Sequence, residues 1–186
     1  MDDPVPSRAV RIVEEAARAG GLSIVVIHHA DTTRTAEDAA AAVGCDVGQI
    51  VKSLVFSVRA ASGGVGDRPD GGTPDGGQGG GAEGEPVLAL VSGRNQLDER
   101  RLAVAAGATG RARRVDAERV RAVTGFAIGG VPPFGHRTPL RCFVDRDLHG
   151  YDVVWAAAGT PHAVFAAAPA ELTRVARGEV ADLRRG

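Results

Sequence analysis

A single lysine lies in an apolar stretch of a chain that otherwise uses arginine for every basic side chain. Lys52 stands in QIVKSLVF, among Ile, Val, Leu and Phe, while all other members of the 22 Lys and Arg residues are arginine. Lysine carries a compact ammonium whose pKa shifts on burial, whereas the arginine fork stays protonated. The position therefore indicates a requirement for an ammonium. The alternative is a strand-edge lysine whose stem covers apolar surface while its head reaches water.

An irregular loop further along the chain is the second stretch whose residue types could do chemistry. Glycine allows backbone angles and close approaches that other residues do not, and proline fixes φ at about −65°. A rigid loop of both can present N–H groups to a carbonyl oxygen or a phosphate. The pattern is neither GxGxxG nor a Walker A sequence, so nucleotide-phosphate binding has little support. The loop, GGVPPFGH, consists of Gly129, Gly130, Val131, Pro132, Pro133, Phe134, Gly135 and His136.

Periodicity and capping signals predict the elements that must hold these residues. Thr35 followed by Asp38 resembles a capping box, and Gly44 ends the helix that the box opens. Asp116 is expected to cap a short helix, and Pro169 suits the first turn of the last helix. Runs of β-branched and apolar residues between turn formers predict strands. The expected helices cover residues 7–18, 35–44, 97–106, 117–123 and 169–178, and the expected strands cover residues 23–29, 51–58, 86–93, 140–145, 151–159 and 162–168.

A glycine-rich segment separates the lysine strand from the next predicted strand. Residues 60–86 hold 11 of the chain's 26 glycines and almost no large apolar side chain. Such a composition buries too little surface to offset the entropy of ordering, so we expect a disordered insertion. The strands on either side are then expected to be antiparallel neighbours joined by a greatly lengthened turn.

The order of the predicted elements indicates the fold class. Strands do not alternate regularly with helices, which disfavours a doubly wound parallel sheet. We expect one α+β domain over residues 1–186, with a curved, largely antiparallel, partly barrel-like sheet flanked by helices. A length of 186 residues and a hydrophobic content of 44% suit one domain with a sizeable core.

Net charge and cysteine usage limit the class of protein. The formal net charge is −1, which does not mark a dedicated nucleic-acid or membrane binder. The two cysteines form no CxxC pair, so neither a disulfide framework nor a metal site is expected, and no cofactor is implied. No apolar stretch approaches the length of a membrane span, so we expect a cytoplasmic protein without a membrane partner.

The lysine strand and the GGVPPFGH loop occur in an order and spacing that resemble the YbaK/EbsC family, which includes editing domains associated with prolyl-tRNA synthetase. The resemblance extends over most of the chain. It is carried by TAEDAAAAVGCDVGQIVKSLVF, PVLALVSGRNQLD, VTGFAIGGVPPFGH and DVVWAAAGTPHAVFAAAPAEL. The glycine-rich insertion departs from the family pattern.

The resemblance implies a hydrolase that deacylates mischarged aminoacyl-tRNA, with a small amino acid on the tRNA for proline as the expected substrate. Lys52 aligns with the family's functional lysine, which would hold the terminal phosphate or ribose, or counter charge at the reacting ester. The GGVPPFGH backbone would position the carbonyl and donate N–H groups to the developing oxyanion. Lys52 and His136 are the candidate catalytic residues, and the rest of the loop is the candidate substrate-binding segment. Gly159 and Thr160 lie where the family has a glycine-containing pocket turn.

Arginines gather in one part of the sequence. Eight of them lie between Arg94 and Arg121, against four carboxylates. They are interpreted either as the solvated faces of two helices or as a weakly basic patch for the acceptor end of an aminoacyl-tRNA. Arg111, Arg113 and Arg114 are the candidate tRNA contacts. Prolyl-tRNA synthetase is the other partner that the resemblance implies.

Two functions of other classes fit the same residues. One is a non-catalytic module that binds a free amino acid or a nucleotide, and the other is an esterase or amidase that acts on small metabolites. A Ser-His-Asp set is not supported, because GxSxG is absent. Cys142, within RCFV, is interpreted as a core residue rather than a nucleophile. His28 and His29 close a predicted strand and could face the pocket, although histidines at strand ends more often face solvent.

Overall fold

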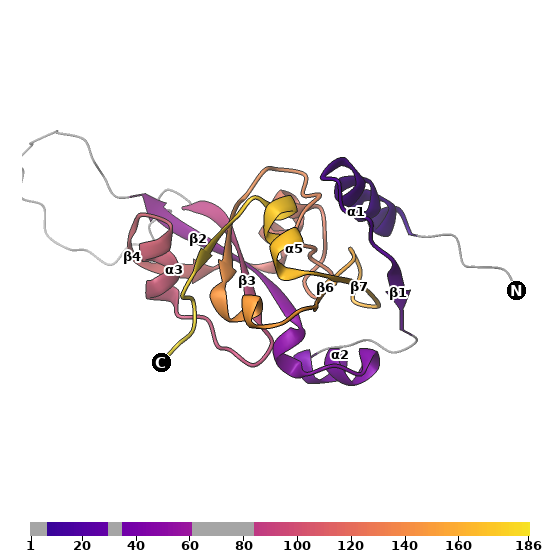
Figure 1. The fold of residues 1–186 in the computed structure, drawn as a ribbon. Helices are drawn as coiled ribbons and strands as arrows, with labels where there is room; N and C mark the ends of the chain where they lie inside the picture. Colours follow the sequence, from indigo (N-terminus) through magenta and orange to yellow (C-terminus); the bar gives the residue numbers. More distant parts are fainter. Residues whose placement is uncertain (1–6, 30–34, 61–83) are drawn as a thin grey trace, which may run out of the picture.

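Two β-sheets and the helices around them form the part of the chain that the computed structural model describes, residues 7–29, 35–60 and 84–186 (Figure 1). The strand order is β4-β2-β3-β5-β8 in the five-stranded sheet and β1-β7-β6 in the three-stranded sheet. In chain order the elements are α1 (Arg8–Ala19), β1 (Val26–His28), α2 (Ala36–Val43), the 3-10 helix η1 (Val47–Gln49), β2 (Val51–Ala60), β3 (Glu85–Ser92), α3 (Glu99–Ala105), β4 (Ala108–Arg114), α4 (Ala117–Thr124), β5 (Arg141–Asp145), the 3-10 helix η2 (Arg146–Gly150), β6 (Val154–Ala157), β7 (Ala163–Ala167), α5 (Pro169–Ala176) and β8 (Gly178–Ala181).

The lysine strand β2 lies near the middle of the larger sheet and pairs antiparallel with β3 along most of its length. The expectation that these strands are antiparallel neighbours is confirmed. Strand residues extend into the segment 60–86 at both of its ends. The rest of the expected insertion, residues 61–83, lies outside the described residues.

The predicted α+β class and the largely antiparallel pairing are confirmed. Antiparallel pairs join β2 to β3 and β4, and β7 to β1 and β6. The exceptions are β3–β5 and β5–β8, which are parallel. A single parallel bridge, Ile50↔Trp155, connects the two sheets, and the sheets do not close into a barrel.

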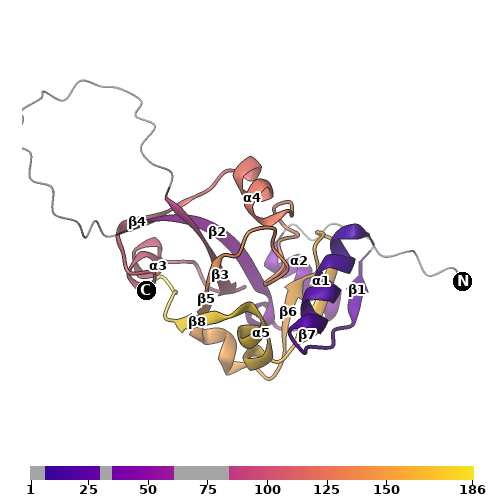
Figure 2. The ribbon, with the colours of Figure 1, turned by 90° about the horizontal axis from the view of Figure 1, so that it is seen from above.

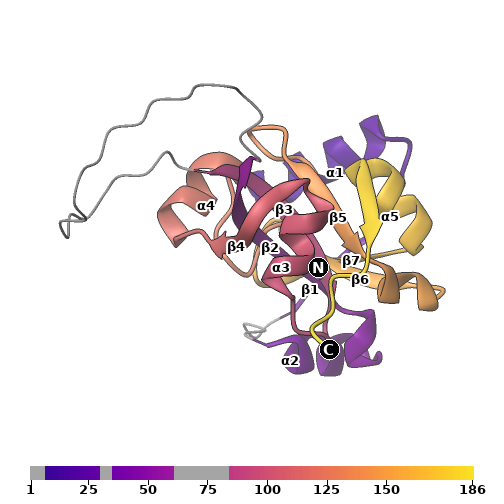
Figure 3. The same cartoon turned by 90° about the vertical axis from the view of Figure 1, so that its left-hand side faces the viewer.

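Apolar side chains cover both faces of the larger sheet. Between the two sheets, α1 and α5 pack with β3, β5, β6 and β7 around the fully buried Phe165 (Figure 2). On the other face, α3 packs over β2, β3 and β5 around Phe143 and Leu102 (Figure 3). Because β3 is covered on both faces, it is a continuous apolar run rather than an alternating one.

Local signals in the sequence set the helix ends. The predicted capping box forms, since the Thr35 hydroxyl accepts from the Asp38 N–H and the Asp38 carboxylate accepts from the Thr35 N–H. Asp116 caps α4, and Pro169 is the first residue of α5, as predicted. No helix within the described ranges is long and apolar enough to cross a membrane.

The arginine-rich stretch is helical only in part, since α3 contains Arg100 and Arg101 and α4 contains Arg119 and Arg121. Arg111, Arg113 and Arg114 lie on β4, which pairs with the outer half of β2. The register of this pair shifts between Ser57 and Arg59, where β4 contains extra residues. This strand and β8 were not predicted, because charged residues and glycine dominate both segments and conceal the alternation of a strand.

Candidate active site

A cavity of about 320 Å³ lies over an open edge of β2. On that side β4 pairs with β2 only from Phe56 onward, and no other named strand of the described chain covers residues 51–55. Consecutive residues of β2 contribute to the wall, as occurs at a strand edge, where side chains of both faces and the backbone are accessible. The lining residues are Thr35, Ala36, Ala39, Ile50, Val51, Lys52, Ser53, Leu54, Ile128, Gly129, Val131, Ala157, Thr160, Pro161 and Val164.

Lys52 lies in the wall of this cavity with its ammonium held by backbone oxygens. Its Nζ donates to the carbonyls of Gly93, at 3.0 Å, and Asn95, at 2.5 Å. An ammonium has three N–H donors, so one remains for a ligand. Burial lowers the pKa of Lys52 below its ordinary value, while the nearby carboxylates of Glu37 and Asp145 act in the opposite direction. The Lys52 side chain is therefore half-buried, its ammonium is hydrogen-bonded and its pKa is lowered, unlike a lysine whose ammonium lies in water.

A buried polar network holds one of these carbonyls in place. The Asn95 side-chain amide donates to Asp145 Oδ2 and to Asp147 Oδ2, both at 2.8 Å. The same Asp145 oxygen accepts the Ser92 N–H at 3.2 Å, and the Asp145 side chain has no solvent exposure. Asn95 is therefore fixed by its side chain while its carbonyl oxygen faces Lys52.

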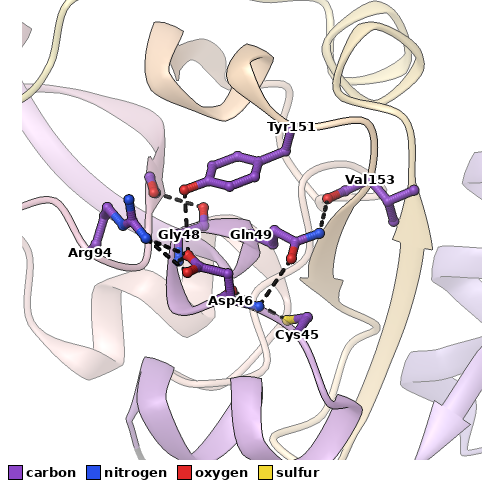
Figure 4. Close-up of polar contacts among 8 residues, drawn as sticks. Cys45, Asp46, Gly48, Gln49, Arg94, Tyr151 and Val153 are labelled. Atoms are coloured by element: carbon purple, nitrogen blue, oxygen red, sulfur yellow. Dashed lines mark hydrogen bonds and ion pairs between the residues drawn. The ribbon is translucent and has the colours of Figure 1, made fainter.

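The turn that contains Gly93, Arg94 and Asn95 is also held by a second polar cluster, which lies beside η1 (Figure 4). Asp46 accepts from the Gly48 N–H at 2.6 Å and takes two bonds from Arg94 Nη2 at 2.7 and 2.9 Å. Tyr151 lies so close to Gly48 that any Cβ there would overlap the phenolic oxygen. Gln49 accepts from the Asp46 N–H at 3.0 Å. The turn that supplies the carbonyls for Lys52 is thus anchored to the segment just before β2.

The GGVPPFGH loop and the Gly159–Thr160 turn, which were predicted separately, pack against each other. A Cβ added at Gly130 would lie 2.8 Å from Thr160 Cα and 3.0 Å from the Gly159 carbonyl carbon. These distances are too short for a side chain, so Gly130 allows the two backbones to touch. Gly159 has φ of 95°, a backbone conformation that favours glycine. The two backbones together form the cavity wall that faces β2.

Two N–H groups of this loop are available to a ligand. The Gly130 N–H donates to the Ala127 carbonyl at 3.0 Å. Within the described chain, the N–H groups of Gly129 and Val131 have no hydrogen-bond partner, and both residues line the cavity. They flank the Gly130 N–H, which is bonded within the loop.

The second half of the loop does not contribute to the cavity lining. Pro132, Pro133 and Phe134 are buried, and Phe134 packs against Phe165 in the core with ring centroids 5.6 Å apart. Gly135 lies against α1. The remaining residue, His136, shares a hydrogen bond of 2.8 Å between Nε2 and the Pro132 carbonyl oxygen. Burial lowers the pKa of His136, and this ring is not among the described residues that line the cavity.

Two hydroxyl groups at the cavity are candidates for contact with substrate or water. Thr160 lines the cavity, and no hydrogen bond to its hydroxyl is present among the described residues. Ser53 also lines it, and its Oγ is buried without a partner in the described chain. Sequence reasoning missed Ser53, although a lone hydroxyl inside VKSLVF beside the lysine was a usable signal.

The candidate tRNA contacts divide into two groups. Arg111 and Arg114 line a second, polar cavity that also reaches Lys52, whereas Arg113 is not among its lining residues in the described chain. All three side chains are exposed.

The remaining candidates from the sequence lie outside the site. Cys142 is buried in the core, and burial raises its pKa to about 12, which supports its interpretation as a packing residue. His28 is exposed, as predicted, but His29 is only half-exposed and its Nε2 is buried without a partner in the described chain. The described residues contain no cluster of His, Cys, Asp and Glu side chains that could hold a metal ion.

Comparison with known proteins gives consistent matches over nearly the whole chain. A model of the aminoacyl-tRNA editing domain matches residues 30–175. The chain is 43% identical to a proposed trans-editing enzyme for prolyl-tRNA synthetase, with a TM-score of 0.78 and coverage of 97% of this chain and 99% of that one. It is 41% identical, with a TM-score of 0.76 and the same coverage, to a protein from a study of computational epitope grafting onto scaffolds. A hypothetical protein is 26% identical with a TM-score of 0.74, over 94% of this chain and 99% of that one. None of the curated proteins matches.

Proposed function

Because the chain belongs to the aminoacyl-tRNA editing domain family, we propose that it hydrolyses tRNA for proline that carries the wrong, small amino acid, and that it does so in trans to prolyl-tRNA synthetase. The family model supports the deacylase activity, and the 43% identical neighbour supports the trans-editing role. Such an enzyme works where translation takes place, in the cytoplasm.

One observation carries the proposal most directly. The cavity beside β2 combines an ammonium, two free backbone N–H groups and otherwise largely apolar walls in about 320 Å³. This volume is at the small end for ligand pockets, which start at roughly 300 Å³. We propose that the aminoacyl group of the substrate is held here. We propose that these polar groups contact the ester carbonyl and its charged neighbours.

The reaction requires stabilisation of one developing negative charge. Water attacks the carbonyl carbon of the ester that joins the amino acid to the terminal ribose, and the carbonyl oxygen becomes an oxyanion. The bond from that carbon to the ribose oxygen then breaks. The ribose oxygen takes one proton that derives from the water, and the amino acid leaves as its acid. We propose that the N–H groups of Gly129 and Val131 donate hydrogen bonds to the carbonyl oxygen and stabilise the oxyanion.

We assign Lys52 an electrostatic role at the junction of ester and phosphate. Two of its donors are occupied by Gly93 and Asn95, so the third can hold the terminal nucleotide's phosphate or ribose oxygen. General-base action would need a neutral amine, which burial favours and the carboxylates of Glu37 and Asp145 disfavour. We assign the ammonium as the working form because two backbone carbonyls accept hydrogen bonds from it.

The other site candidates receive different roles. The hydrogen bond between His136 and Pro132 supports a positioning role for His136, which holds the loop rather than touches the substrate. Thr160 and Ser53 are the proposed hydroxyl partners of the attacking water or of the substrate's amino group. Gly130 and Gly159 maintain the contact between the two backbones.

A second, size-selective site has a physical justification. A missing methylene changes binding by only about 1–3 kcal/mol, so a synthetase pocket alone cannot reject smaller amino acids strongly. We propose that the cavity here admits the small amino acids that such a pocket fails to exclude.

Deacylation of a panel of mischarged tRNAs under single-turnover conditions tests the proposal. We expect the fastest release of a small amino acid from tRNA for proline, with little release of proline itself. Binding without turnover across the whole panel would instead support a non-catalytic module. Faster hydrolysis of small-molecule esters than of any aminoacyl-tRNA would support a metabolite esterase.

A further inference from the structure

A second, polar cavity of about 520 Å³ adjoins the first on the α3 side of β2. Lys52 and Leu54 line both cavities, so the two meet at these side chains. We call the second one the basic groove. Its charged lining consists of five cations and two carboxylates: Lys52, Arg100, Arg111, Arg114, Arg185, Asp98 and Glu99.

The arginines of the basic groove come from separate parts of the chain. Arg100 lies in α3, Arg111 and Arg114 lie in β4, and Arg185 follows β8 near the end of the chain. Residues on a regular strand alternate between faces, so positions three apart should point to opposite sides. The register shift of β4 against β2, together with Gly110 at φ of 79°, interrupts this alternation. The bulge therefore brings both β4 arginines to one groove.

These cations are not neutralised by ion pairs. Within residues 7–29, 35–60 and 84–186, none of the four groove arginines forms a salt bridge, whereas several other arginines do. Of the two carboxylates, Asp98 caps α3 by accepting from the N–H groups of Arg100 and Arg101. These hydrogen bonds, above all the one from Arg101, lower the pKa of Asp98. The groove thus keeps an excess of unpaired positive charge.

We propose that the basic groove binds the phosphodiester backbone of the single-stranded 3′ end of the tRNA, just before the aminoacylated nucleotide. The inference rests on the proposed function, since the aminoacyl group would then occupy the apolar cavity on the other side of Lys52. Guanidinium forks bind phosphate oxygens in pairs and suit successive phosphates of a strand. The polyanionic RNA strand thus matches the basic groove, and the aminoacyl group matches the apolar cavity. Lys52 lines both.

Binding of uncharged RNA tests this surface independently of catalysis. The probe is a short single-stranded RNA that ends in CCA, labelled at its 5′ end and followed by fluorescence anisotropy over a series of KCl concentrations. In the double variant Arg111→Glu/Arg114→Glu we expect affinity at low salt to fall by about tenfold or more. The slope of log affinity against log salt should become shallower by about 1.4, at about 0.7 for each phosphate lost.

Two further variants serve as matched controls. Arg113→Glu reverses an exposed charge on the same strand outside the groove, and it should change affinity less than about twofold. Asp98→Asn removes a carboxylate from the groove but keeps a good helix cap, so it should bind RNA more tightly. Melting temperatures of all variants check that folding is intact.

Three outcomes would overturn the proposal. Equal losses in the Arg113→Glu and double variants would mean that RNA senses only overall charge. An unchanged affinity and salt slope in the double variant would place RNA elsewhere. Competition by inorganic triphosphate at the affinity of the RNA would indicate a small-anion site rather than a strand-binding groove. If the wild type binds RNA through the groove yet deacylates no tRNA, the groove stands and the editing function fails.

Discussion

The substitution Asp145→Asn tests whether the network behind Lys52 acts on the ammonium. Asp145 has no solvent exposure and accepts hydrogen bonds from the Ser92 N–H, the Asn95 amide and the Asp147 N–H. An asparagine keeps the shape but has only one acceptor oxygen, so at least one of these donors must face an NH₂ group. The hydrogen bonds from the remaining donors also become weaker, because the acceptor is no longer charged. We therefore expect the free energy of unfolding to fall by about 2–4 kcal/mol. For a domain of this length the melting temperature should fall by roughly 4–16 °C.

The effect on activity follows from two physical changes at Lys52. The charge of Asp145 raises the pKa of Lys52 against the larger effect of burial, so its removal lowers that pKa further. If the ammonium is the working form, activity is lost as pH rises through the pKa, and this alkaline limb should move to lower pH. The freed Asn95 carbonyl should also misplace the ammonium. Since a displacement of about 1 Å can cost up to about a hundredfold, we expect the single-turnover rate to fall by about tenfold or more.

The assay is single-turnover deacylation across a pH series, at a temperature where the variant is fully folded and with spontaneous ester hydrolysis subtracted. Asp152→Asn is the matched control, because Asp152 is exposed and has no hydrogen bond or ion pair within the described residues. It should retain the rate, the pH profile and the melting temperature. If Asp145→Asn loses stability but keeps the wild-type rate and alkaline limb, the network is structural only and does not position Lys52.

Four other substitutions test separate parts of the site, and one labelling reaction tests the core. Lys52→Arg and Lys52→Ala should each lower the deacylation rate by about a hundredfold with little change in melting temperature, and a near-normal arginine variant would contradict the role of the ammonium. Gly130→Ala should reduce the rate by about tenfold or more, because its Cβ would lie 2.8 Å from Thr160 Cα and must push the two backbones apart. Ser53→Ala should stabilise the protein by about 1 kcal/mol, since it removes a buried unpartnered hydroxyl, but should slow deacylation; an unchanged rate would remove Ser53 from the site. Because burial raises the pKa of Cys142 to about 12, iodoacetamide at neutral pH should label this thiol only in unfolded protein, and rapid labelling of folded protein would show that the core around it opens.

Much of the architecture could be predicted because local signals and long-range pairing agree. The capping box at Thr35, the proline at the start of α5 and the apolar run of β3 each need only their own neighbours in sequence. The antiparallel pairing of β2 with β3 could be predicted as well, because the intervening segment is too polar to form a layer of its own. The family assignment from the ordered motifs is confirmed by the match over residues 30–175.

Features that depend on contacts between distant residues could not be predicted. Lys52 was identified from its type, but the carbonyls of Gly93 and Asn95 that hold it are separated from it by a long insertion. Whether His136 faces the cavity depends on how the loop packs over the core, and two prolines do not determine that direction. The bulge in β4 is likewise invisible in a run of arginines, although it decides which of them share a groove.

The position of Lys52 explains why this chain keeps one lysine among arginines. Its Nζ lies within hydrogen-bond distance of two backbone carbonyls at the end of β3, a narrow site that suits a compact ammonium with three donors. A guanidinium spreads its donors over a plane and could not satisfy both carbonyls while turning a third donor to the ligand. The groove beside it is lined by arginines, whose wide forks and permanent charge are suited to a polyanion. The chain therefore uses lysine where the ammonium must fit between two backbone carbonyls, and arginine along the rest of the basic groove.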